Sequence, residues 1–148
     1  MIILKLLILL VAIISQIYCL QLTDKSYKPC DNANNVKSIE VIPCSSEPCA
    51  FKRSTQVSVR ADFTTQTNAD FCRLEMKAQL GDWYPISEEA ACPGFLNCPL
   101  KTNEDNTLNY KTTVDSALPA GERLTRWKLI CDSGATQVFC ADINIVIQ

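Results

Sequence analysis

The chain has 148 residues, of which 47% are hydrophobic and 20% are charged, with a formal net charge of −2 and no histidine. This length fits one domain, and the charge excludes the strongly basic surface of a nucleic-acid-binding protein. The lack of histidine removes the commonest general base and the commonest metal ligand. An enzyme is therefore the least expected class, and the adjacent acids Glu88-Glu89 and Glu104-Asp105 are interpreted as solvated surface.

The first 19 residues predict a secretory signal peptide. After Lys5, residues 6–14 form an uninterrupted apolar run that ends at the polar Ser15 and Gln16. A bilayer span needs about 20 apolar residues, so this shorter run is typical of the h-region of a signal. A retained signal anchor is the alternative. Cleavage after Cys19 would leave one domain, residues 20–148, outside the cell or in the endolysosomal lumen.

The rest of the chain is dominated by apolar and polar residues that alternate with period two, the pattern of half-buried antiparallel strands. In chain order, this pattern predicts strands over residues 36–42, 57–63, 72–80, 107–114, 127–131 and 139–147. The segment Asp132-Ser133-Gly134-Ala135 is typical of a hairpin turn between the last two strands. Several short strands separated by turns predict an all-β fold, either a sandwich or a barrel.

Nine cysteines are present, and cleavage after Cys19 would leave eight, an even number that predicts four disulfides in a secreted chain. Cys44 and Cys49 enclose one short loop, and Cys92 and Cys98 enclose a second. Spacing alone would permit a metal site, but an oxidising compartment argues against it, so no metal is expected. The cysteines left for long-range bonds are Cys30, Cys72, Cys131 and Cys140.

The succession of these motifs resembles the ML lipid-recognition domain family, which includes the soluble Niemann–Pick type C sterol carrier and the group two dust-mite allergens. The resemblance extends from Cys30 to Ile147. It is carried by Val41-Ile42-Pro43-Cys44-Ser45-Ser46-Glu47-Pro48-Cys49, by Asn97-Cys98-Pro99-Leu100 and by Phe139-Cys140. It implies an immunoglobulin-like β-sandwich of two antiparallel sheets with an apolar lipid pocket between them.

The same resemblance implies three disulfides, namely Cys30–Cys140, Cys44–Cys49 and Cys92–Cys98. Cys72 and Cys131 are additional to the six cysteines usual in the family. Both lie on the apolar face of their predicted strands, so we expect them to form a fourth bond inside the sandwich. Two buried free thiols are the alternative.

From the residues alone, the inward apolar side chains are as consistent with a filled core as with a pocket, and the resemblance favours the pocket. The resemblance also implies that Tyr84, in a segment expected to be a loop, is an aromatic gate at the pocket mouth. Leu118 stands where sterol-binding relatives have an aromatic residue, which leaves sterol selectivity open. The expected lipid-binding residues are Val57, Val59, Phe63, Tyr84, Val114, Leu118 and Trp127.

The implied function is the binding and transfer of a lipid, with a sterol as the leading ligand and a fatty acid as the other. We expect a monomer that needs no cofactor, with a membrane sterol transporter or a receptor as its partner. Two alternatives stay open, a subunit that presents a lipid to an innate-immune receptor and an interaction module with a filled core. The basic residues of the second half are scattered among acids, so no cluster for phosphorylated lipids is expected; they are Lys101, Lys111, Arg123, Arg126 and Lys128.

Overall fold

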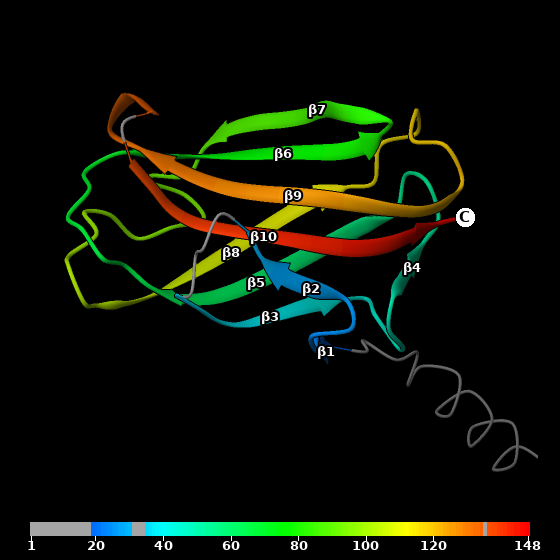
Figure 1. The fold of residues 1–148 in the computed structure, drawn as a ribbon, viewed down its shortest axis with the longest axis horizontal. Helices are drawn as coiled ribbons and strands as arrows, with labels where there is room; N and C mark the ends of the chain where they lie inside the picture. Colours follow the sequence, from blue (N-terminus) through cyan, green and yellow to red (C-terminus); the bar gives the residue numbers. More distant parts are fainter. Residues whose placement is uncertain (1–18, 31–34, 135) are drawn as a thin grey trace, which may run out of the picture.

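A computed structural model of the chain describes residues 19–30, 35–134 and 136–148 (Figure 1). The predicted signal peptide lies almost entirely outside these residues and stays a prediction. Within the described ranges, no helix has the length and apolar character needed to cross a bilayer.

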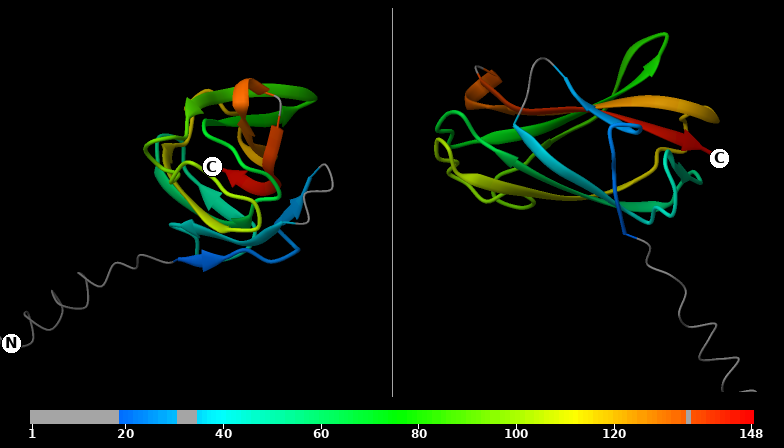
Figure 2. Two further views of the ribbon diagram at one scale, coloured as in Figure 1. Left: turned by 90° about the vertical axis from the view of Figure 1, so that its left-hand side faces the viewer. Right: turned by 60° about the horizontal axis from the view of Figure 1, so that its bottom comes forward.

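The described residues form two sheets that pack face to face as a β-sandwich (Figure 1, Figure 2). The first sheet has the order β1 (Leu20–Gln21), β3 (Val36–Ile42), β5 (Gln56–Thr64) and β8 (Asp105–Thr113). The second has the order β2 (Tyr27–Pro29), β10 (Thr136–Ile147), β9 (Gly121–Cys131), β6 (Cys72–Leu80) and β7 (Asp82–Ala90). A short strand, β4 (Cys49–Phe51), pairs in parallel with the end of β10. The other strand pairs are antiparallel, so the predicted sandwich of antiparallel sheets is confirmed.

Alternate residues of the long strands form the core, as the period-two pattern predicts. In β5, for example, Val57, Val59, Ala61 and Phe63 are all buried. The rings of Phe63 and of Phe139 in β10 pack across the two sheets with their centroids 5.4 Å apart. Removing such apolar surface from water stabilises the sandwich by about 25 cal/mol per Å². The predicted turn after β9 contains a 3-10 helix, Asp132–Gly134, and residue 135 lies outside the description.

The segment around Tyr84 differs from expectation, because it is strand β7 rather than a loop. β7 follows β6 through a hairpin in which Leu80 faces Asp82, and Gly81 between them has a φ of +98°. Only glycine adopts this backbone conformation readily. β7 is the outermost strand of its sheet, its side chains are mostly exposed, and a bulge shifts its register near Pro85. An exposed edge strand needs no alternation, so the period-two pattern misses it.

Four disulfides are formed within the described residues, and they are the four expected pairs. Cys30–Cys140 ties the end of β2 to β10, Cys44–Cys49 closes the loop before β4, and Cys92–Cys98 closes the loop after β7. Cys72–Cys131 joins directly opposite residues of β6 and β9, with a Cα–Cα distance of 4.0 Å. This distance is a little below the usual span of about 4.4–6.8 Å.

Candidate functional site

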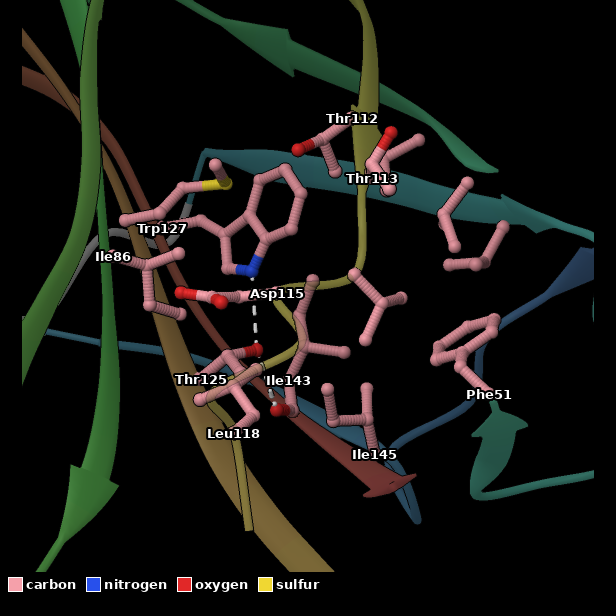
Figure 3. A pocket seen from close by; sticks show the side chains of 15 residues that line it. Phe51, Ile86, Thr112, Thr113, Asp115, Leu118, Thr125, Trp127, Ile143 and Ile145 are labelled. Atoms are coloured by element: carbon pink, nitrogen blue, oxygen red, sulfur yellow. Dashed lines mark hydrogen bonds between the residues drawn. The ribbon is translucent and has the colours of Figure 1, made fainter. Parts of the chain in front are cut away.

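An apolar pocket lies between the sheets at the end of the sandwich where β8 and β10 end and β5 and β9 begin (Figure 3). The first sheet contributes Val41, Val57, Val59, Thr112 and Thr113. The second sheet contributes Phe51, Met76, Ile86, Thr125, Trp127, Ile143 and Ile145. The loop that links β8 to β9 completes the wall with Val114, Asp115 and Leu118.

The pocket is narrow. Its volume is about 70 Å³. Since a buried water needs about 10–15 Å³, the interior has room for a few waters. Pockets that enclose a whole organic ligand usually measure about 300–1,000 Å³. The walls must therefore move apart to admit a lipid.

The polar atoms deepest in the pocket satisfy one another. The indole Nε1 of Trp127 donates a hydrogen bond to Thr125 Oγ1 at 3.1 Å, and that hydroxyl donates to the carbonyl oxygen of Ile143 at 3.0 Å. Figure 3 shows these bonds, with the indole ring projecting into the pocket. Thr125 and Trp127 are both buried. A buried polar group that is paired no longer needs water, so this wall presents an apolar surface.

One side of the sandwich is held together by side chains rather than by a backbone ladder. β7 and β8 are the outer strands of their respective sheets, and Tyr110 of β8 donates a hydrogen bond from its hydroxyl to the Glu89 carboxylate of β7. The Tyr110 ring contacts Phe95 and Trp127, with centroid distances of 4.8 and 5.9 Å. Burial of the ring, and secondarily the bond to Glu89, raise the pKa of the Tyr110 hydroxyl. The hydroxyl therefore keeps its proton at neutral pH and acts as the donor.

Five of the seven expected lipid-binding residues line this pocket: Val57, Val59, Val114, Leu118 and Trp127. Phe63 does not, because it lies toward the opposite end of β5 and fills the core against Phe139. Tyr84 does not either, and 57% of its surface is exposed on β7. It follows the turn of the β6–β7 hairpin, which diverges from the rest of the sandwich (Figure 2).

Ten of the fifteen lining residues are not among the expected lipid-binding residues, and four of them show why. Thr125 shares the inward parity of Trp127, and that parity could have identified it. Phe51 belongs to a strand of three residues, and Ile86 to the exposed strand β7, so neither shows a periodic pattern. Asp115 lies in a loop, where no pattern predicts which way a side chain points.

The lining of the pocket contains almost no ionisable groups among the described residues. Among the lining residues that the structure describes, Asp115 is the only ionisable side chain, whereas proton-transfer chemistry needs a positioned acid or base beside a reacting group. The sulfur atoms of Cys72, Cys92 and Cys98 lie within 4.8 Å of one another elsewhere in the fold. All three are in disulfides, and a metal binds thiolates.

Comparisons with known proteins agree with this architecture. A family model described as the ML domain matches residues 24–147. A canine protein named NPC intracellular cholesterol transporter 2 is 27% identical over 128 residues, which cover 82% of this chain and 84% of the relative. The mite group 2 allergen Tyr p 2 of Tyrophagus putrescentiae is 33% identical over 118 residues, covering 76% and 80% of the two chains. The crystal structure of a Niemann-Pick type C2 protein from Japanese carpenter ant superposes with a TM-score of 0.72 at 17% identity, over 82% of this chain and 98% of that one.

Proposed function

The chain belongs to the ML domain family, and from that premise we propose that it binds a lipid, with a sterol as the leading ligand, between its two sheets and carries it between membranes. The family match and the cholesterol transporter named among its relatives support this proposal. We also propose that the protein acts as a monomer, outside the cell or in the endolysosomal lumen.

The observation that carries the proposal is the pocket whose deepest polar groups are already paired. Because Trp127, Thr125 and the Ile143 carbonyl satisfy one another, an apolar guest displaces no required hydrogen bond from water. Burying roughly 500 Å² of apolar lipid at about 25 cal/mol per Å² contributes on the order of 12 kcal/mol. Association costs roughly 4–15 kcal/mol, so the net affinity is moderate. A carrier that must release its cargo needs such reversible binding.

The arrangement of the sheets supports a route for widening the pocket. Across the side where β7 faces β8, the sheets are joined by the Tyr110–Glu89 hydrogen bond and by ring contacts. Such contacts separate without the loss of a backbone ladder. We infer that β7, which carries the lining residue Ile86, moves outward when a lipid enters.

The test combines identification of the natural ligand with a measurement of transfer. Lipids extracted from the purified native protein are identified by mass spectrometry. The purified protein is then assayed for binding of the fluorescent sterol dehydroergosterol and for its transfer from donor to acceptor vesicles. We expect both binding and protein-dependent transfer. Recovery of no lipid, together with no sterol or fatty-acid uptake, would instead favour an interaction module with a filled core.

Two neighbouring residues of β10 provide a matched pair of variants. Ile145 lines the pocket, whereas Val146 is equally half-buried and points to the opposite face of the strand. Ile145→Trp places an indole in the pocket and should abolish sterol binding. Val146→Trp adds the same side chain outside the pocket and should leave binding intact. Equal binding by both variants would place the lipid elsewhere.

The alternative, a subunit that presents a lipid to a receptor, would use the same pocket. The two roles differ in whether the protein alone moves a sterol between vesicles, and only a carrier does so. Among the described lining residues there is no lysine or arginine to bind a phosphorylated headgroup. The carrier is therefore the function that the geometry supports best.

A further inference from the structure

The polar side chains at the pocket mouth gather on one short stretch of chain. Thr112 and Thr113 end β8, and Asp115 follows in the next loop. All three are at least partly exposed to solvent, whereas the deeper residues Val57 and Met76 are buried. The opposite rim, formed by the half-buried Ile86 and Ile145, is apolar.

Asp115 gives this polar rim a negative charge. Its Oδ1 accepts a hydrogen bond from the backbone N–H of Ala117 at 2.8 Å, which orients the carboxylate. Figure 3 shows the carboxylate directed from its loop toward Ile86 on β7. The structure records no hydrogen bond or ion pair for Oδ2, the other carboxylate oxygen, within the described residues.

Two arginines contact the same loop, but neither lines the pocket. Arg53 donates from Nε to the carbonyl oxygen of Leu118 at 2.8 Å, and Arg123 donates from Nη2 to that of Ala120 at 2.6 Å. These guanidinium groups hold the backbone of the loop. Asp115 therefore carries the only formal charge among the described lining residues.

We propose that Asp115 makes the pocket select lipids whose polar end is an uncharged hydroxyl over lipids of the same shape whose polar end is an anion. This inference rests on the proposed function, because it concerns the same pocket. A lipid that enters apolar end first leaves its polar end at the rim. A hydroxyl there donates a hydrogen bond to the carboxylate, and charge assistance strengthens that bond. A carboxylate, sulfate or phosphate is repelled, and partial burial strengthens the repulsion. The selectivity thus arises chiefly because anionic lipids bind more weakly.

The test uses pairs of lipids that differ only at the polar end. Cholesterol is compared with cholesterol sulfate, and 1-hexadecanol with hexadecanoate, each as a competitor that displaces dehydroergosterol at pH 7.4. We expect the full chain after signal removal to prefer the alcohol of each pair by at least about tenfold, which corresponds to about 1.4 kcal/mol. Asp115→Asn keeps the side-chain shape and an oxygen for the Ala117 bond. It should reduce the preference to within about threefold, mainly by tightening binding of the anion.

Asp82→Asn serves as the matched control, since it removes the same charge from the turn side of β7, outside the lining. It should retain the wild-type preference. Raising the salt concentration screens the repulsion, so the preference of the unmutated protein should also shrink between 20 mM and 1 M salt. This measurement needs no variant and serves even where Asp115→Asn fails to fold.

Equal affinity of the unmutated protein for both members of each pair would overturn the inference, as would an unchanged preference in Asp115→Asn. Either result would leave the proposed function standing, because lipid binding would still be observed. If the unmutated protein bound none of the four lipids and no dehydroergosterol, the proposed function itself would fail, and the inference with it.

Discussion

Replacing Thr125 by valine tests how the pocket wall is built. Valine keeps the shape of the side chain but removes the hydroxyl, so the buried Nε1–H of Trp127 loses its acceptor and the Ile143 carbonyl loses one donor. Leaving a buried donor unpaired costs about 1–3 kcal/mol. The Ile143 carbonyl remains in the β9–β10 ladder. The loss of the Thr125 hydroxyl as its second donor therefore contributes less to the destabilisation than the unpaired indole N–H does. We expect the free energy of unfolding to fall by about 2 kcal/mol.

The assay is a double-mutant cycle measured by urea unfolding. Trp127→Phe removes the indole N–H, so Thr125→Val in that background no longer strands a donor. In the Trp127→Phe background, Thr125→Val should lower the free energy of unfolding by at least about 1 kcal/mol less than it does in the wild-type background. If the cost is the same in both backgrounds, the Trp127–Thr125 bond does not stabilise the wall, and the account of a pocket with internally paired polar groups is wrong.

Three further predictions concern other residues of the two sheets. Tyr110→Phe removes the hydrogen bond to Glu89 between β8 and β7, so it should lower the free energy of unfolding by about 1 kcal/mol. It should also speed the uptake of dehydroergosterol measured by stopped-flow fluorescence. An unchanged uptake rate would contradict the inferred outward movement of β7. Phe63→Ala should lower the free energy of unfolding, measured in urea, by about 3–5 kcal/mol. Tyr84→Ala, at an exposed position, should lower it by less than about 0.5 kcal/mol. Similar losses for the two variants would refute the assignment of Phe63 to the core and of Tyr84 to the surface. Burial opposes ionisation of Asp62, but hydrogen bonds from Thr107 and Ser38 and the nearby Arg60 together lower its pKa. The stabilisation by ionised Asp62 is therefore present at neutral pH and lost in acid. Asp62→Asn should have a lower free energy of unfolding than the wild type at pH 7, and this difference should disappear as the pH falls below about 4. A difference that does not change with pH would show that the charge of Asp62 does not stabilise the fold.

The long strands were predictable because each buries one face. Burial of alternate residues imposes the period-two pattern seen in β5 and β6. β7 was not predictable in this way, because it lies at the edge of its sheet and contains Pro85 beside a bulge. Neither of its faces is fully buried, so its residues are not selected for alternation.

The candidate site was predictable only in part, because alternation identifies a face and not a position along the sandwich. Val59 and Phe63 share a face of β5, but Val59 lines the pocket and Phe63 packs in the filled half of the core. Where the sheets separate depends on the three-dimensional fit of both sheets. Asp115 could not be identified either, since a loop residue has no partner strand that determines its direction.

The free edge of β7 has a consequence for self-association. In the described part of the chain, β6 is the ladder partner of β7, and the outer edge of β7 carries backbone groups that a second molecule could extend into a larger sheet. Proline lacks an N–H, and charged side chains discourage strand addition. β7 has both, in Pro85 and in the exposed acids Glu88 and Glu89. These two features therefore keep the free edge of β7 from becoming a template for aggregation.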